Sequence, residues 1–186
     1  MKKNIVILIV VGVILILAIG VVYFFWQGGP EIRRLNKNLP EGIRIEKRGD
    51  QQVIVNKKDG YEIKVPKDWG GVREVEYLSK ESGLTIGAQD TEDWVSVSVY
   101  EVLRGIDFDV WLKQFLKDHP LSFPEKITSI IGEEKIKNYK VIKIKVEHPM
   151  TGTTFFYYFQ TDSHIYEIYT DYSEKSIRAV ILNGNF

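Results

Sequence analysis

The stretch DGYEIKVPKDW at residues 59–69 combines a turn, a strand and a stop. The Asp-Gly pair favours a β-hairpin, because glycine accepts the positive φ that such turns need. After it, Tyr61, Ile63 and Val65 alternate with charged residues, which is typical of a sheet with one solvent-exposed side. Pro66 ends the strand, because proline has no N–H to donate to a neighbour.

Trp69 follows that stop and stands among charged residues. We interpret it as a side chain that folds back and seals one end of the core, where burial of a large aromatic ring stabilises the fold. The alternative is an exposed ring that binds a ligand. On the first interpretation the stretch forms a structural corner made of Gly60, Tyr61, Pro66 and Trp69.

Strand patterns dominate the rest of the chain. Residues 95–99 and 142–146 alternate apolar and polar side chains, whereas residues 155–159 are apolar on both faces and predict a central strand with cover on both sides. Two helices can supply cover, one capped by Asp107 and one capped by Ser173. The fold class predicted is α+β, with antiparallel strands and helices.

The N-terminal residues 5–26 form an uncharged apolar run. At ~1.5 Å per residue a helix of this length spans a bilayer core of ~30 Å. The pattern predicts a single transmembrane signal anchor over residues 1–26 and a lipid bilayer as partner of residues 5–26. A signal peptide cleaved after Gly20 is the alternative. The aromatic residues expected at the membrane interface are Tyr23, Phe24, Phe25 and Trp26.

The predicted organisation continues with a linker over residues 27–41 and one folded domain over residues 42–186. Basic residues flank the apolar run on both sides, so the positive-inside rule gives a near tie. We expect a cell-membrane location with the C-terminal domain outside the cytoplasm, because a short basic leader before a long apolar segment is typical of a signal anchor.

The run from Gly60 to Trp69 matches the pattern G-[FY]-x-[IF]-x-[YV]-P-x-x-W, and a Val-rich strand, a helix with Trp111-Leu112 and an aromatic hairpin follow it. This order resembles the PsbP-like family, whose fold is shared with a Ran-binding nuclear import factor and bacterial envelope proteins. The resemblance implies a three-layer sandwich, a twisted antiparallel sheet flanked by helices, and a role in binding or assembly. The tail at residues 183–186 departs from the family pattern.

Few residues indicate catalysis or a bound group. The chain has no cysteine, and its 25 basic and 25 acidic residues give no electrostatic footprint for nucleic acid. The three histidines have no metal-ligand spacing, and the carboxylates of residues 90–93 lack a calcium-loop frame. Ser96 and Ser98 lack a nucleophile elbow. The sequence therefore predicts no enzyme activity, no metal and no cofactor.

Tyrosines gather in the C-terminal region, and tyrosine is favoured at protein interfaces. The function predicted is a membrane-anchored, non-catalytic binding or assembly-accessory domain of the cell envelope, with a protein partner. A membrane-tethered hydrolase-type enzyme and a structural subunit of a secretion or surface assembly are the alternatives. The partner surface predicted consists of Tyr157, Tyr158, Tyr166, Tyr169 and Tyr172.

Overall fold

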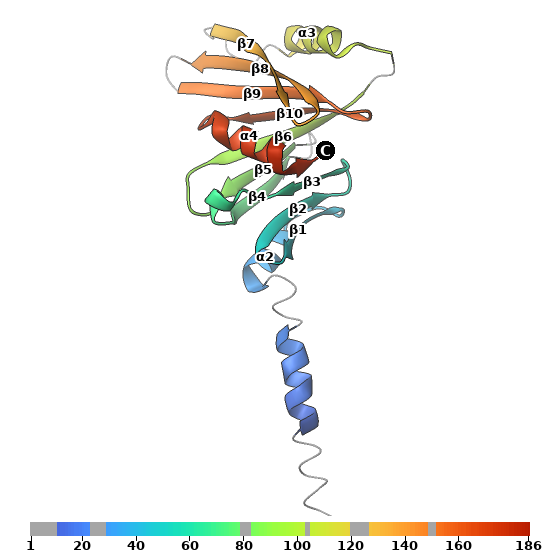
Figure 1. Cartoon of the computed structure of the whole chain (residues 1–186), viewed down its shortest axis with the longest axis vertical. Helices are drawn as coiled ribbons and strands as arrows, with labels where there is room; N and C mark the ends of the chain where they lie inside the picture. The colour runs from blue at the N-terminus through green and yellow to red at the C-terminus, as the bar shows by residue number, and fades with distance from the viewer. Residues whose placement is uncertain (1–10, 23–28, 79–82, 103–104, 120–126, 149–151) are drawn as a thin grey trace, which may run out of the picture.

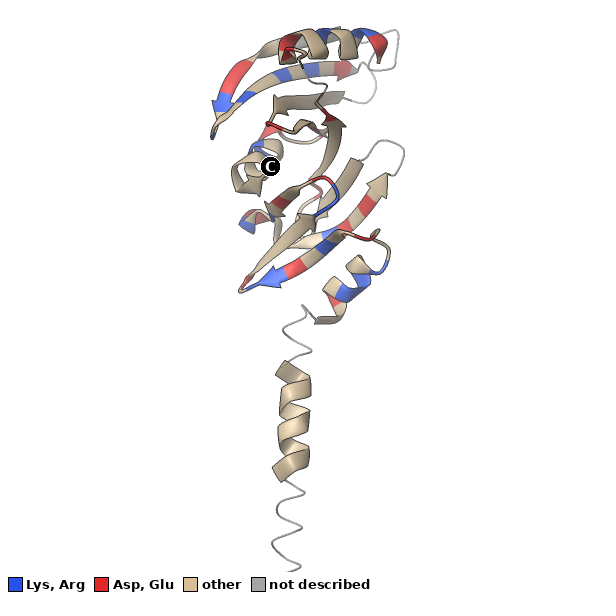
Figure 2. Cartoon of the chain, turned by 90° about the vertical axis from the view of Figure 1, so that its right-hand side faces the viewer, with Lys and Arg blue, Asp and Glu red and all other residues tan. Residues whose placement is uncertain are grey.

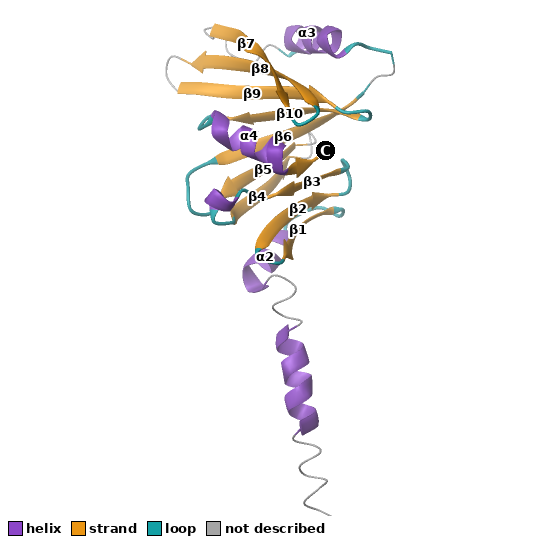
Figure 3. Cartoon of the chain, in the orientation of Figure 1, coloured by secondary structure: helices purple, strands orange, loops and turns teal. Residues whose placement is uncertain are grey.

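The structure is a computed structural model that describes residues 11–22, 29–78, 83–102, 105–119, 127–148 and 152–186 (Figure 1). Within these residues the protein is mostly β, with 47% strand and two antiparallel sheets (Figure 3). The first sheet has the order β1-β2-β3-β11 and the second has the order β4-β5-β6-β10-β9-β8-β7.

The first sheet consists of β1 (Ile43–Arg48), β2 (Gln51–Asn56), β3 (Tyr61–Lys64) and β11 (Gly184–Asn185). The second consists of β4 (Val72–Leu78), β5 (Gly83–Ala88), β6 (Trp94–Glu101), β7 (Ile127–Ile136), β8 (Tyr139–His148), β9 (Gly152–Gln160) and β10 (His164–Thr170). The helices of the folded part are α2 (Gly29–Asn36), the short η1 (Lys67–Trp69), α3 (Phe108–Asp118) and α4 (Glu174–Asn183).

The inner face of the seven-stranded sheet packs against the first sheet and α4, and Figure 1 shows α4 crossing in front of this sheet. Val97 and Ile168 point to this face, as does Tyr157, while Ile54 and Ile177 meet them from the first sheet and from α4. All five side chains are fully buried. The main hydrophobic core therefore lies between the two sheets.

The C-terminal residue Phe186 completes this core. Its ring centroid lies 5.7 Å from that of Tyr61, 5.1 Å from that of Phe159 and 4.9 Å from that of Tyr166. Residues far apart in the sequence thus meet around the last side chain of the chain.

The outer face of the seven-stranded sheet is covered in part by α3. Leu112 is buried there with Ile144 and Tyr158, and Phe156 packs against them. Asp107 caps α3 by accepting hydrogen bonds from two backbone N–H groups, and Ser173 caps α4, as the sequence predicted. The prediction of a central strand at 155–159 is also confirmed, because β9 lies between β10 and β8 and has apolar neighbours on both faces.

Helix α2 lies where the sequence predicted a linker. Ile32 and Leu35 are buried in the main core, so the segment is amphipathic rather than uniformly polar. Asn36 pairs with the edge strand β1: its Nδ2 donates to the carbonyl oxygen of Ile45 at 2.9 Å, and its Oδ1 accepts from the Ile45 N–H at 2.6 Å. The side chain thereby satisfies backbone groups that the edge strand would otherwise leave to solvent.

The predicted fold class is wrong in its layers. Instead of one sheet between helices, the protein has two facing antiparallel sheets and is mostly β. The two sheets separate at residues 66–71, where η1 redirects the chain, so β3 pairs with β2 and β11 while β4 starts the other sheet. Strand pairing is a long-range property, and alternation within single strands predicts each strand but not its neighbour.

The predicted transmembrane signal anchor is also wrong. Among the described residues, no helix combines the length and the apolar character needed to cross a membrane. The predicted membrane location stays a prediction, and the expected interface residues Tyr23, Phe24, Phe25 and Trp26 lie outside the described residues.

Candidate functional site

The structure separates the five predicted interface tyrosines into two groups. Tyr157, Tyr158 and Tyr166 are buried, with at most 1% of each side chain exposed. Tyr169 is partly exposed and Tyr172 is 50% exposed. Only the last two can contribute to a surface that a partner contacts directly.

The three buried tyrosines are structural hydrogen-bond donors. The hydroxyl of Tyr157 donates to Glu174 at 2.8 Å, that of Tyr158 donates to Glu167 at 2.6 Å, and that of Tyr166 donates to the carbonyl oxygen of Asp59 at 3.2 Å. Burial raises the pKa of all three phenols, that of Tyr166 to about 12. They therefore stay protonated near neutral pH, and each satisfies a polar group inside the protein.

Four aromatic rings form a continuous row at one end of the outer face. We call Trp94, Phe156, Tyr169 and Tyr172 the aromatic surface. The ring centroid of Trp94 lies 5.6 Å from that of Tyr169 and 6.4 Å from that of Tyr172, both in edge-to-face geometry. Phe156 stacks on Tyr169 at 5.3 Å and continues toward Tyr158 at 6.4 Å. The row thus runs from exposed Tyr172 to the small core under α3.

Strand register and one threonine hold the aromatic surface together. Tyr169 lies opposite Ser96 on one side and opposite Phe156 on the other, which places the rings of β10 and β9 on the same face. Thr170 donates a hydrogen bond from Oγ1 to the carbonyl oxygen of Trp94 at 2.5 Å, and its Oγ1 accepts from the N–H of Tyr172 at 3.2 Å. This threonine is fully buried, so it fixes the ends of both strands.

Carboxylates adjoin the aromatic surface. Glu92 and Asp93 directly precede Trp94, and Asp171 directly precedes Tyr172. A fourth, Glu74, lies close to Gly87, because a Cβ placed on that glycine would meet the Glu74 side chain at 2.9 Å, and Gly87 pairs with Trp94 in the sheet. We call these four carboxylates, Glu74, Glu92, Asp93 and Asp171, the acidic margin of the aromatic surface. No group of three or more metal-ligating side chains occurs in the described part of the chain.

A buried polar row crosses the middle of the outer face. Ser96 lies 3.2 Å from the hydroxyl oxygen of Thr85, and Ser98 pairs in register with Glu167, whose carboxylate accepts from Tyr158. Both serines are at least 97% buried. They face neighbouring strands inside the protein, so the structure gives them packing and hydrogen-bonding roles.

The corner at residues 60–69 is part of the scaffold. Trp69 is 2% exposed, and its carbonyl oxygen accepts from the N–H groups of Gln89 and Asp90 at 3.1 and 3.0 Å. Tyr61 is likewise buried, and Gly60 has a φ of 75°, as the hairpin turn requires. Burial of Trp69 agrees with the interpretation of a ring that seals one end of the core.

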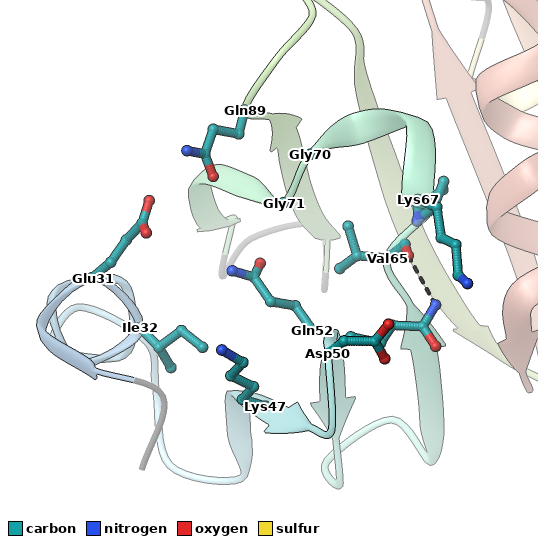
Figure 4. A pocket seen from close by; sticks show the side chains of 12 residues that line it. Glu31, Ile32, Lys47, Asp50, Gln52, Val65, Lys67, Gly70, Gly71 and Gln89 are labelled. Carbon is teal, nitrogen blue, oxygen red and sulfur yellow. Dashed lines mark hydrogen bonds between the residues drawn. The ribbon is translucent and has the colours of Figure 1, made fainter. Parts of the chain in front are cut away.

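Next to the corner lies a polar pocket of about 430 Å³ (Figure 4). Its side chains include Glu31, Lys47, Gln52 and Gln89, which come from α2, the first sheet and the β5–β6 loop. Gln52 Oε1 accepts from the N–H of Val72 at 2.8 Å, so part of the lining serves the backbone where the second sheet begins. Neither histidine nor serine is among the described residues that line this pocket.

The histidines do not come together in a site that the structure describes. His119 ends α3 and stacks on Phe115, with ring centroids 4.6 Å apart, whereas His164 begins β10 and contacts Ser163. The side chain of His148 lies outside the described residues.

Comparisons with known proteins give no family for the chain: no family model matches it, and no curated protein matches it. The resemblance to the PsbP-like family therefore stays a prediction. The class that the fold defines is a two-sheet, mostly β domain with an aromatic surface at the end of its larger sheet.

Two residues of the aromatic surface were missed by the sequence analysis. Trp94 was assigned only to the start of a strand, and Phe156 only to a buried one. A signal was present for Trp94, because it directly follows the polar, acidic residues 90–93, and polar connecting segments run over the protein surface. For Phe156 no such signal exists, because its neighbours in the sequence are all aromatic.

Proposed function

We propose that this protein is a non-catalytic protein-binding domain that contacts its partner through the aromatic surface. The observation that supports this proposal most directly is the exposure of Tyr172 at the end of a continuous row of rings. Tryptophan and tyrosine are enriched among the residues that dominate binding energies at protein interfaces. Each presents a large area and loses little conformational freedom when bound.

The rigidity of the surface supports the same proposal. Its rings are anchored by antiparallel strand pairing and by the bonds of buried Thr170. A surface that is already ordered before binding loses less entropy in the complex than a mobile loop does. The aromatic surface is thus suited to binding a partner without rearrangement.

The hydrolase-type alternative has less support. An enzyme of this kind needs an acid, a base and a nucleophile that converge in a pocket. The polar pocket of Figure 4 brings together lysine, glutamine and carboxylate side chains, and its named lining holds no hydroxyl nucleophile. The serines of β6 are instead buried in the sheet.

Affinity capture with matched variants tests the proposal. The full-length chain, purified in a non-ionic detergent, is used to capture proteins from an extract of the source cells, alongside Tyr172→Ala and the control Val110→Ala. Val110 is 59% exposed on α3, so the control removes exposed apolar area that is not part of the aromatic surface. We expect a protein that the wild type and V110A capture and that Y172A loses.

A partner retained by Y172A and also by the double variant W94A/Y172A would contradict the proposal. The structural-subunit alternative predicts something different, namely recovery of the chain in a fixed ratio with other proteins that survives high salt. Quantification of the captured proteins by mass spectrometry separates these outcomes.

A further inference from the structure

We propose that the aromatic surface binds a lysine- or arginine-rich segment of the partner protein. This inference rests on the protein-binding function proposed above and adds the chemistry of the partner. The aromatic rings and the acidic margin beside them carry it together, because neither alone distinguishes a basic partner from an apolar one.

The acidic margin contrasts with the rest of the molecule. Over the whole chain basic and acidic residues balance, and Figure 2 shows the two kinds interspersed along strands and helices. Residues 89–94 include three carboxylates and no cation, and residues 169–173 add Asp171 and no cation. The chain segments that carry Trp94, Tyr169 and Tyr172 are thus acidic in a protein that has no net charge.

Two cations near the acidic margin already have carboxylate partners, one of them within the margin itself. Arg73 pairs with Glu74 at 3.0 Å, and Lys175 pairs with Asp68 at 2.7 Å. No ion pair of Glu92 or Asp93 is found within the described residues, whose ion pairs involve other carboxylates. A cationic partner therefore finds exposed Glu92 and partly exposed Asp93 without an ion pair in the described part of the chain.

The rings favour the same kind of partner. A guanidinium or ammonium group is attracted to the face of an aromatic ring, most strongly to that of tryptophan. Trp94 stands perpendicular to Tyr169 and Tyr172, with interplanar angles of 90° and 84°. Rings at right angles form a corner rather than a flat platform, and a long basic side chain can lay its methylene groups on one ring and its charge on another.

A titration with defined peptides tests the proposal. Fluorescently labelled peptides of equal length, one rich in Arg and Lys and one rich in Glu, are added to the full-length chain in a non-ionic detergent, and anisotropy is recorded. We expect the basic peptide to bind and the acidic one not to bind. The affinity for the basic peptide should fall by roughly tenfold as salt rises from about 50 to about 500 mM, because salt screens charges near the protein surface.

Variants with matched loss of charge give the decisive comparison. The variant E92Q/D93N removes two carboxylates from the acidic margin, and E41Q/E133Q removes two exposed carboxylates elsewhere. We expect the first to weaken binding of the basic peptide by about tenfold and the second to leave it unchanged, since opposite charges act at close range. Circular dichroism melts confirm that each variant is folded. Equal weakening in both variants, or no binding of the basic peptide to the wild type, would overturn the proposal.

Failure of this inference can be told apart from failure of the proposed function. If E92Q/D93N still captures the cellular partner while Y172A loses it, the surface binds a protein whose segment is not basic. If E92Q/D93N, Y172A and W94A/Y172A all capture it as the wild type does, the proposed function fails as well. Concentration-dependent self-association that Y172A abolishes would show that a second copy of this chain occupies the surface, and would overturn the basic-partner proposal.

Discussion

The two faces of the seven-stranded sheet are built from the same strands but are covered by different parts of the protein. The inner face packs against a second sheet and α4, and the side chains at its centre, such as Val97, Tyr157 and Ile168, are apolar or aromatic and fully buried. The outer face carries a smaller core under α3, a buried polar row, and the partly exposed aromatic surface. The difference indicates that the inner face provides stability, while the end of the outer face is available for binding.

The strongest test of this comparison is Trp69→Ala, which removes the ring that seals the inner core. Trp69 is 2% exposed, so we expect the free energy of unfolding to fall by about 3–5 kcal/mol, as for other large aromatic deletions. Urea denaturation followed by circular dichroism measures it, and Trp69→Phe serves as a control that should recover much of the loss. An unchanged midpoint for W69A would refute its structural role.

A truncation tests the contribution of α2 to the inner core. Deletion of residues 1–28 keeps α2, whereas deletion of residues 1–38 removes Ile32, Leu35 and the Asn36 side chain that pairs with β1. We expect the shorter fragment to be less stable by about 2–4 kcal/mol, because it lacks two buried apolar side chains. Part of that loss is offset, since the fragment has fewer residues whose conformational entropy is lost on folding. Equal melting temperatures of the two fragments would show that α2 is a linker after all.

The buried pair of the outer face is tested by Tyr158→Phe. The change deletes the hydroxyl that donates to Glu167 and leaves a buried carboxylate with one donor fewer. We expect a loss of about 1–3 kcal/mol in the free energy of unfolding. The double variant Y158F/E167Q should be more stable than Y158F alone, because a neutral amide costs less to bury than a carboxylate does.

Acid titration tests an ionic contact on the inner side, at the start of α4. Burial raises the pKa of Glu174, but hydrogen bonds from Lys143 and Tyr157 outweigh it, and the net shift is downward. A carboxyl with a depressed folded pKa stabilises the protein above its unfolded value of ~4.3, and this contribution disappears as the pH falls through the folded pKa. The melting temperature of E174Q should therefore lie below that of the wild type at pH 7, and the gap should narrow and then close as the pH falls below ~4.3 and through the folded pKa. A gap that persists at low pH would assign the effect to packing instead.

The smallest expected effect on stability comes from Tyr172→Ala on the aromatic surface. This ring is half exposed, so the free energy of unfolding should change by no more than about 0.5 kcal/mol. Partner capture should nevertheless be lost. A large fall in the melting temperature would mean that Tyr172 supports the fold, and the contrast between the two faces would then fail.

Local patterns predicted single elements well. The caps Asp107 and Ser173 and the central position of β9 agree with the structure. Each depends on neighbouring residues, such as a side-chain oxygen before a helix or an apolar run without alternation. The linker prediction missed α2, because many charged residues conceal two apolar positions three residues apart, Ile32 and Leu35.

The candidate site was less predictable than the elements. Of the five tyrosines predicted to form the partner surface, three are buried. The sequence could not separate these three from the others, because alternation shows that successive side chains face opposite sides of a sheet but not which side is covered. Trp94 joined the aromatic surface only through the pairing of β6 with β10. Exposure is set by whatever packs on a face, and that packing involves segments distant in the sequence.

The sequence by itself determined the strands at residues 61–65, 95–99, 142–146 and 155–159, the two capped helices and the corner at Trp69, because hydrophobic periodicity, turn chemistry and capping act over a few residues. Only the tertiary structure decided that the strands divide into two sheets and that α2 belongs to the core. It alone placed Trp94 and Tyr172 side by side with carboxylates around them. The physical reason is that strand partners and face coverage are selected by the burial of apolar area over the whole chain, which no local pattern records.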